Sequence, residues 1–229
     1  MKKSINTFLK HPTKDSSNRS ANPAVTRAST ILFNTMQELH QHEKKIKRHQ
    51  KVSHYSYGRY GSSTTIELEN ILKELEQAFH VFLTGTGFGG VALAIMSLCR
   101  PGDEILVSDN VYGPTKEISE KLLKEFNVTA KFYNPEAFED LKSKISKKTK
   151  MILVENPGSN TFEFQDLSKI INLAKRKKIL TFLDNTWGTP LYLKPLKLGF
   201  DMSFCSATKY FSGHSDAMGG SLAVNKKVF

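Results

Sequence analysis

The chain has 229 residues, of which 39% are hydrophobic and 24% are charged, with a formal net charge of +11 at pH 7. That length and apolar content suffice for the core of one large domain or two small ones, and they indicate a globular protein. No stretch approaches the roughly 18 apolar residues of a membrane span. The polar start MKKSINTFLKHPTKDSSNRS lacks the apolar segment of a secretory signal. The sequence therefore predicts a cytoplasmic protein without a membrane partner.

The cysteine and lysine residues further limit which cofactors and partners the sequence predicts. Cys99 and Cys205 are the only cysteines and have no metal-ligand spacing, so we expect two reduced structural thiols and no metal site. The lysines are spread over EKKIKRHQK, KSKISKKTK and AKRKK without interleaved aromatic residues. Such a diffuse positive field predicts non-specific attraction to anions, not a specific nucleic-acid partner.

Residues 1–60 are predicted to form an irregular amino-terminal arm. Pro12 and Pro23 interrupt it, and residues 35–51 have helix-forming composition but a weak apolar stripe. The arm ends in YSYGRYGSST, which places Tyr57 and Arg59 in a glycine-containing turn. The segment TTIELENILKELEQAF that follows has apolar residues at helical spacing and predicts an amphipathic helix. We therefore expect a second domain over residues 61–229.

From about residue 81 the pattern alternates between strand and helix. The expected strands lie in VFLT, RPGDEILVSD, TAKFYN, KMILVEN, ILTFLDN, MSFCSAT and SLAVN. Helical segments separate most of them, and several strands are almost continuously apolar, which predicts an α/β fold with a mostly parallel sheet covered by helices on both faces. Ligands in such folds bind beyond the carboxyl ends of the strands. We expect the residues that follow the strands to gather there; these are residues 84–90, 109–112, 156–160, 184–187 and 206–209.

A glycine-rich turn in this region is compatible with two cofactors. Gly85, Gly87 and Gly90 spell GxGxxG between a strand and a helix, and Asp109 ends the next strand, as in a dinucleotide-binding fold. A nicotinamide-dependent dehydrogenase is therefore one candidate. The backbone N–H groups of such a turn bind any phosphate, however, so the motif alone does not choose the cofactor.

A lysine and an aspartate further along the chain favour a different cofactor. Lys209 follows an apolar strand in SATK, next to the hydroxyls of Ser206 and Thr208, which suits a lysine that holds a phosphorylated aldehyde as a Schiff base. Asp184 ends the apolar strand ILTFLDN, where a carboxylate needs a positive partner such as a pyridinium nitrogen. A dinucleotide would give neither residue a role.

Together these motifs resemble the cysteine and methionine metabolism group of pyridoxal-phosphate enzymes, fold type I. The segments that carry the resemblance are YGRYGSST, YGPT, ENPGSNTFE, LDNTWGTPLYLKPLKLGFD and SATKYFSGHSDAMGG. The PGSxTFE and DNTW…GHSDAM forms look like the cystathionine β-lyase branch. The resemblance covers nearly all of residues 22–229 and implies a large domain of the aspartate aminotransferase type.

Carried over residue by residue, the resemblance implies a complete set of contacts to pyridoxal 5′-phosphate. Lys209 would be the Schiff-base lysine and Asp184 the partner of the ring nitrogen. The phosphate would be held by Ser206, Thr208 and the backbone of Gly87 and Phe88. Phe88 stands where relatives often have methionine, but a backbone contact would tolerate that change.

The resemblance also assigns three residues outside this set. Tyr112 would stack on the cofactor ring, close to the substrate. Tyr57 and Arg59 would reach the phosphate of a neighbouring subunit, which implies a homo-oligomer, a dimer or tetramer, with shared sites. The arm would then pack on a second copy of the chain.

The implied reaction is β-elimination from cystathionine, a step of transsulfuration and methionine biosynthesis. Lys209, partly neutral through burial, would remove the Cα proton, and the products would be homocysteine, pyruvate and ammonia. Relatives of this family are longer, and their small carboxy-terminal domain, with the arginine that binds the substrate carboxylate, would be missing after Phe229. The chain is thus expected to be either a lyase, an inactive truncated remnant of one, or a non-catalytic interaction protein that keeps the fold.

Overall fold

The structure, a computed structural model, describes residues 22–48, 50, 52 and 54–229. The described residues fall into two compact units, one ending at Ile71 and one running from Leu72 to Phe229. The division lies inside helix α3 (Ser63–Glu76), later in the chain than the predicted boundary after residue 60. A role of the first unit as an inter-subunit arm stays a prediction.

The first unit contains little regular structure. Helix α2 (Met36–Lys47) begins after Thr35, whose hydroxyl accepts a hydrogen bond from the backbone N–H of Glu38, and it buries none of its residues. The short 3₁₀ helix η1 (Gly58–Tyr60) begins next to a single β-bridge between Thr30 and Tyr57. The absence of buried side chains on α2 agrees with its weak apolar stripe.

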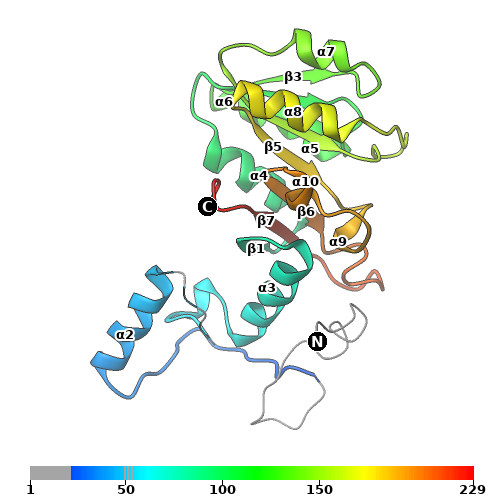
Figure 1. The fold of residues 1–229 in the computed structure, drawn as a ribbon. Helices are drawn as coiled ribbons and strands as arrows, with labels where there is room; N and C mark the ends of the chain where they lie inside the picture. The colour runs from blue at the N-terminus through cyan, green and yellow to red at the C-terminus, as the bar shows by residue number, and fades with distance from the viewer. Residues whose placement is uncertain (1–21, 49, 51, 53) are drawn as a thin grey trace. The chain divides into compact units, whose positions relative to one another are not determined.

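The second unit is built on a seven-stranded sheet in the order β1-β7-β6-β5-β4-β2-β3 (Figure 1). The strands are β1 (His80–Thr84), β2 (Glu104–Ser108), β3 (Thr129–Tyr133), β4 (Thr149–Glu155), β5 (Leu180–Asp184), β6 (Met202–Ser206) and β7 (Gly220–Val224). Within this sheet β7 runs antiparallel to both of its neighbours, and the other neighbouring pairs are parallel. The predicted, mostly parallel sheet is confirmed.

Helices cover both faces of this sheet, as predicted. They are α4 (Gly87–Leu98), α5 (Gly113–Glu120), α6 (Leu122–Glu125), α7 (Phe138–Ser143), α8 (Leu167–Lys177), α9 (Thr189–Tyr192) and α10 (Pro195–Leu198). Residues of α4 and α6 belong to one buried core cluster, and residues of α7 and α8 belong to a second cluster, on the other face. The short helices α9 and α10 were not anticipated, because four residues are too few to show a helical period.

The alternation of side chains along each strand explains the two core clusters. On β4, Met151 and Leu153 join the α4 side, whereas Ile152 and Val154 join the α8 side. A parallel strand that is apolar on both faces reads as a continuous hydrophobic run, which is why the sequence identified it.

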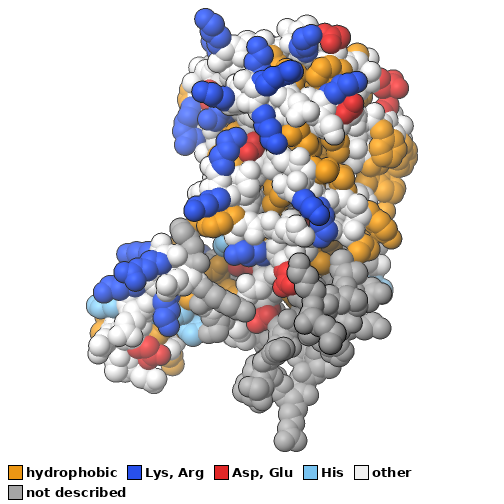
Figure 2. All heavy atoms as spheres, viewed as in Figure 1, with side chains coloured by type: hydrophobic (Ala, Val, Ile, Leu, Met, Phe, Trp, Pro, Cys, Tyr) orange, Lys and Arg blue, Asp and Glu red, His pale blue; other side chains and the backbone are white. Residues whose placement is uncertain are grey.

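Lys and Arg side chains are distributed over the surface that carries α7 and α8, with Asp and Glu between them (Figure 2). The last turn of α8 contains three basic residues, Lys175, Arg176 and Lys177. This spread agrees with a diffuse positive field. Within the part of the chain that the structure describes, no helix combines the length and the apolar character required to cross a membrane.

Glu76 is a buried acid at the carboxyl end of α3. It is 2% exposed, and its Oε1 accepts a hydrogen bond of 3.3 Å from the Ser203 hydroxyl, while the Cys205 thiol lies 3.8 Å away. Its Oε2 has no hydrogen-bond partner among the described residues. Burial is the main cause that raises the pKa of Glu76 to about 7. The second unit therefore carries an acid that is half protonated near neutral pH.

Glu76→Gln should change how stability depends on pH. Because the pKa of Glu76 is raised to about 7 from 4.5, its stabilising effect is full below about pH 4.5 and is lost as the pH rises through 7. Chemical denaturation should show the wild type losing up to about 1.4 kcal/mol per pH unit through this group in that window. The Gln variant should lack that loss.

Glu74→Gln, at an exposed position of the same helix, is the matched control and should keep the wild-type slope. Equal slopes in the two variants would contradict this account of Glu76.

Candidate active site

The carboxyl ends of three adjacent parallel strands meet at one edge of the sheet. β4 ends at Glu155, β5 at Asp184 and β6 at Ser206, and in the ladder Glu155 pairs with Asp184. They open into a pocket of about 1450 Å³. Every predicted site residue except Tyr57 and Arg59 lines this pocket: Gly87, Phe88, Tyr112, Asp184, Ser206, Thr208 and Lys209.

One end of the pocket is formed by the amino terminus of α4. Thr86 caps the helix by accepting a 3.0 Å hydrogen bond from the N–H of Gly89, which leaves the first helical N–H groups, on Gly87 and Phe88, directed outward. A helix amino terminus with free N–H groups binds anions. Gly87 also packs closely on β6, because a Cβ there would lie 2.6 Å from the Ser206 hydroxyl oxygen. This end of the pocket therefore suits a phosphate.

Asp184, which also lines the pocket, is held in a chain of hydrogen bonds that joins β5 to β6. Asp184 Oδ1 accepts from Thr186 twice, from the backbone N–H at 3.0 Å and from the hydroxyl at 2.6 Å. The same hydroxyl accepts a 2.9 Å bond from the N–H of Ser206. Burial raises the pKa of Asp184 above its ordinary value, and the two bonds from Thr186 lower it. The arrangement fixes a carboxylate in the same pocket as the helix terminus.

Lys209 lies in the turn after β6. Its N–H donates to the Ser206 carbonyl at 3.1 Å, and its own carbonyl accepts from Gly213 at 2.8 Å. The residue is exposed, and the burial of its amine beside the bound cofactor stays a prediction. The hydroxyl of Thr208 is already engaged, since it accepts from the N–H of Gly219 at 3.1 Å.

Tyr112 stands at the start of α5 and is held by Glu155, a residue that the sequence analysis missed. The N–H of Tyr112 donates to Glu155 Oε2 at 2.7 Å, and the tyrosine itself is 49% exposed to the pocket side. Burial, and then the nearby Asp184, raise the pKa of Glu155. Its position at the carboxyl end of the strand KMILVEN was the signal that could have identified it.

Three aromatic side chains were also missed. The rings of Trp187 and Phe162 meet edge to face with centroids 5.1 Å apart, and those of Trp187 and Tyr210 lie 6.2 Å apart. All three line the pocket, from three separate loops. Their sequence separation hid the cluster, although Trp187 directly follows the predicted site segment.

Tyr57 and Arg59 belong to the first unit. The guanidinium of Arg59 lies 5.4 Å from the centroid of the Tyr57 ring and 5.1 Å from that of Tyr60, and it donates to the Tyr60 hydroxyl at 3.2 Å. Gly58 between them packs against the backbone, because a Cβ would lie 2.1 Å from the Ala28 carbonyl oxygen. The turn is thus well defined, and its contact with a neighbouring subunit stays a prediction.

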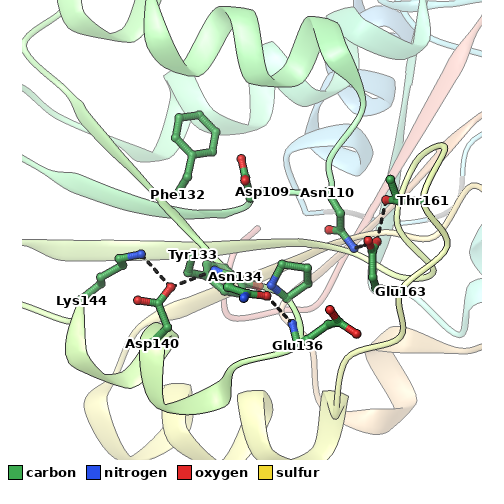
Figure 3. A pocket seen from close by; sticks show the side chains of 11 residues that line it. Asp109, Asn110, Phe132, Tyr133, Asn134, Glu136, Asp140, Lys144, Thr161 and Glu163 are labelled. Carbon is green, nitrogen blue, oxygen red and sulfur yellow. Dashed lines mark hydrogen bonds and ion pairs between the residues drawn. The ribbon is translucent and has the colours of Figure 1, made fainter.

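A second hollow of about 470 Å³ lies beside the ends of β2 and β3 (Figure 3). Four acids, Asp109, Glu136, Asp140 and Glu163, are among its lining residues. Asp109 forms an ion pair with Lys116 and Asp140 one with Lys144. Asp109 therefore lines a different pocket from the glycine turn, which removes the ribose acid that a dinucleotide site requires. Among the described residues no group of three or more potential ligands is placed to hold a metal ion.

The fold and this pocket define a fold type I, pyridoxal-phosphate-dependent enzyme. Residues 6–229 match the family model described as Cys/Met metabolism PLP-dependent enzyme, and the chain belongs to this family. Its cofactor is pyridoxal 5′-phosphate.

Individual proteins show the same relationship. The chain is 33% identical to cystathionine beta-lyase of Bordetella avium, with 99% of this chain and 57% of that protein covered. It is also 33% identical to L-alanine/L-glutamate racemase of Wolbachia pipientis wMel, over 92% of this chain and 53% of that protein.

One solved structure superposes on this chain with a TM-score of 0.84 at 27% identity. It comes from Campylobacter jejuni, is described as an O-acetylhomoserine (thiol)-lyase, and contains N′-pyridoxyl-lysine-5′-monophosphate. That superposition covers 94% of this chain and 52% of the other. The chain thus spans about half the length of the relatives it matches.

The residues present fit this cofactor. The pocket offers free N–H groups at the α4 terminus, a hydrogen-bonded carboxylate at Asp184 and, at Lys209, the one cationic side chain among the described residues that line it. These groups match the phosphate, the ring nitrogen and the aldehyde, respectively.

Gly87→Ala should weaken pyridoxal-phosphate binding about tenfold or more, equivalent to about 1.4 kcal/mol. The new Cβ would lie 2.6 Å from the Ser206 hydroxyl oxygen and would push β6 away from the helix terminus. Gly85→Ala is the matched control in the same turn, since nothing lies within 4 Å of its Cβ position. Titration of both variants with the cofactor checks this; similar dissociation constants would refute the proposed phosphate position.

Proposed function

We propose that this chain forms the cofactor-binding part of a carbon–sulfur lyase that acts on cystathionine or a related sulfur amino acid. The observation that carries the proposal is the pocket in which Lys209, Asp184 and the amino terminus of α4 converge. The 33% identity to the Bordetella avium cystathionine beta-lyase supports the choice of reaction. Methionine biosynthesis in the cytoplasm is the setting that this reaction implies.

The residues divide the chemistry between them. When bound, pyridoxal phosphate supplies an electron sink for the charge left on Cα after bond cleavage. Lys209 anchors the cofactor and removes the Cα proton, while Asp184 keeps the ring nitrogen protonated. The backbone N–H groups of Gly87 and Phe88 would bind the phosphate together with the Ser206 and Thr208 hydroxyls, the latter by exchanging its bond to the Gly219 carbonyl. Cleavage of the Cβ–S bond would release homocysteine as the thiol and leave an enamine, which water would hydrolyse to pyruvate and ammonia.

Tyr112 and the first unit complete the proposed site. Tyr112 would stack on the cofactor ring close to the substrate, from a position fixed by the 2.7 Å bond from its N–H to Glu155. Tyr57 and Arg59 bind the phosphate of a neighbouring subunit, in a homo-oligomer whose sites are shared. The exposed arginine and tyrosine of that turn are consistent with such a contact.

Lys209→Ala should abolish both the visible absorption band of lysine-bound cofactor and pyruvate release from cystathionine, the latter by about a thousandfold or more. Lys197→Ala, at an exposed position on α10, is the control and should behave like the wild type. Pyruvate release is measured with a coupled dehydrogenase assay. Equal activity in the two variants would overturn the proposed role of Lys209.

Amino-acid racemisation is a second candidate, because of the Wolbachia pipientis relative. Tyr112 and Lys209 line the same pocket, so one can remove a Cα proton and the other can return it. Chiral chromatography of alanine and glutamate after incubation separates the two activities. Racemisation without pyruvate would favour this second function, and a cofactor band with neither product would favour a non-catalytic protein.

A further inference from the structure

Glu155 and Asp184 place two carboxyl groups side by side in the pocket. They occupy paired positions on the neighbouring parallel strands β4 and β5. Their side chains point to the same face of the sheet as Leu153 and Phe182, which lie two residues earlier on the same strands. Paired residues on adjacent strands lie about 5 Å apart. The two acids are therefore close enough to influence each other's ionisation.

No positive charge compensates the pair directly. Among the described residues, neither acid takes part in an ion pair. Lys209 is the one cationic residue lining the same pocket, and it is exposed. The groups that face Glu155 are Asp184 on β5, Tyr112 at the start of α5 and Ser159 in the loop after β4. Two like charges in such a place are costly, so one acid should hold a proton.

Hydrogen bonding and burial together indicate which acid holds the proton. Asp184 accepts two bonds from Thr186 on one oxygen, and bonds of this kind favour the ionised form. Glu155 is held by the backbone N–H of Tyr112 and by the Ser159 hydroxyl, but it is only 6% exposed, whereas Asp184 is half-buried. Burial and the neighbouring Asp184 both raise the pKa of Glu155, in agreement with this assignment.

We propose that Glu155 is the protonated member of a carboxyl pair with Asp184, and that as a neutral acid it positions Tyr112 and leaves one negative charge facing the pocket. The significance of that single charge rests on the proposed function, because one carboxylate matches one protonated ring nitrogen. The protonation itself belongs to the cofactor-free chain and is tested there.

Infrared difference spectroscopy of the cofactor-free chain detects protonated carboxyl groups directly. The measurement uses the Glu76→Gln background, which removes the other buried glutamate whose pKa is raised near neutrality. At pH 6.5 we expect a protonated-carboxyl band that disappears in Glu155→Gln. The band should remain in Glu120→Gln, the control at an exposed position of α5.

Asp184→Asn supplies a second variant that keeps Glu155. Loss of the neighbouring charge should move the titration midpoint of the band at least one pH unit lower, a tenfold fall in proton affinity. The backbone amide resonance of Tyr112 should titrate with the same midpoint in the parent chain and stay fixed in Glu155→Gln. If Glu155 had only a structural role, the carboxyl band and the Tyr112 amide resonance would not titrate with a common midpoint.

Three results would overturn the proposal: no band at pH 6.5, a band that survives Glu155→Gln, or a midpoint that does not move in Asp184→Asn. Failure of the chain to bind pyridoxal phosphate, with the band and its titration as expected, would instead count against the proposed function. The protonation of Glu155 and the proposed function can therefore be refuted independently of each other.

Discussion

The site depends on the parallel pairing of β4, β5 and β6. Their ladder pairs Glu155 with Asp184 and Asp184 with Phe204, two residues before Ser206. The N–H of Asn185 extends this pairing by donating to the Phe204 carbonyl at 2.7 Å. A shift of one residue in a strand would turn its side chains to the opposite face. Asp184 would then point toward the α8 core instead of the pocket. Backbone hydrogen bonds, more than side-chain contacts, thus determine which residues meet.

The pocket that results is electrically divided. The start of α4 presents backbone N–H groups to the pocket, and the ends of β4 and β5 present the carboxyl groups of Glu155 and Asp184. The net charge of +11 contributes little here, because most lysines lie elsewhere on the surface. A molecule with a phosphate at one end and a protonated ring at the other is the natural complement of this arrangement.

Much of this architecture could be predicted from the sequence. The apolar strands, the glycine turn and the residues that follow each strand are local features, and they placed Lys209, Asp184 and Ser206 correctly at one edge. Glu155 and the Trp187 cluster could not be recognised, because their significance depends on neighbours from other strands and loops. The insertion of β7 between β1 and β6 was likewise invisible, since strand order is set by non-local pairing.

The position of β7 has a consequence for biosynthesis. β1 is hydrogen-bonded to β7, and β7 to β6, so the glycine turn after β1 is joined to the rest of the sheet through a strand that is translated after all the others. A nascent chain that has emerged only as far as β6 contains both β6 and the glycine turn after β1, but it still lacks β7, the strand that joins β1 to β6. Pairing over such long sequence separations is slow. The edges of β1 and β6 that pair with β7 therefore stay open to chaperones or to unwanted strand pairing until residues 220–224 leave the ribosome.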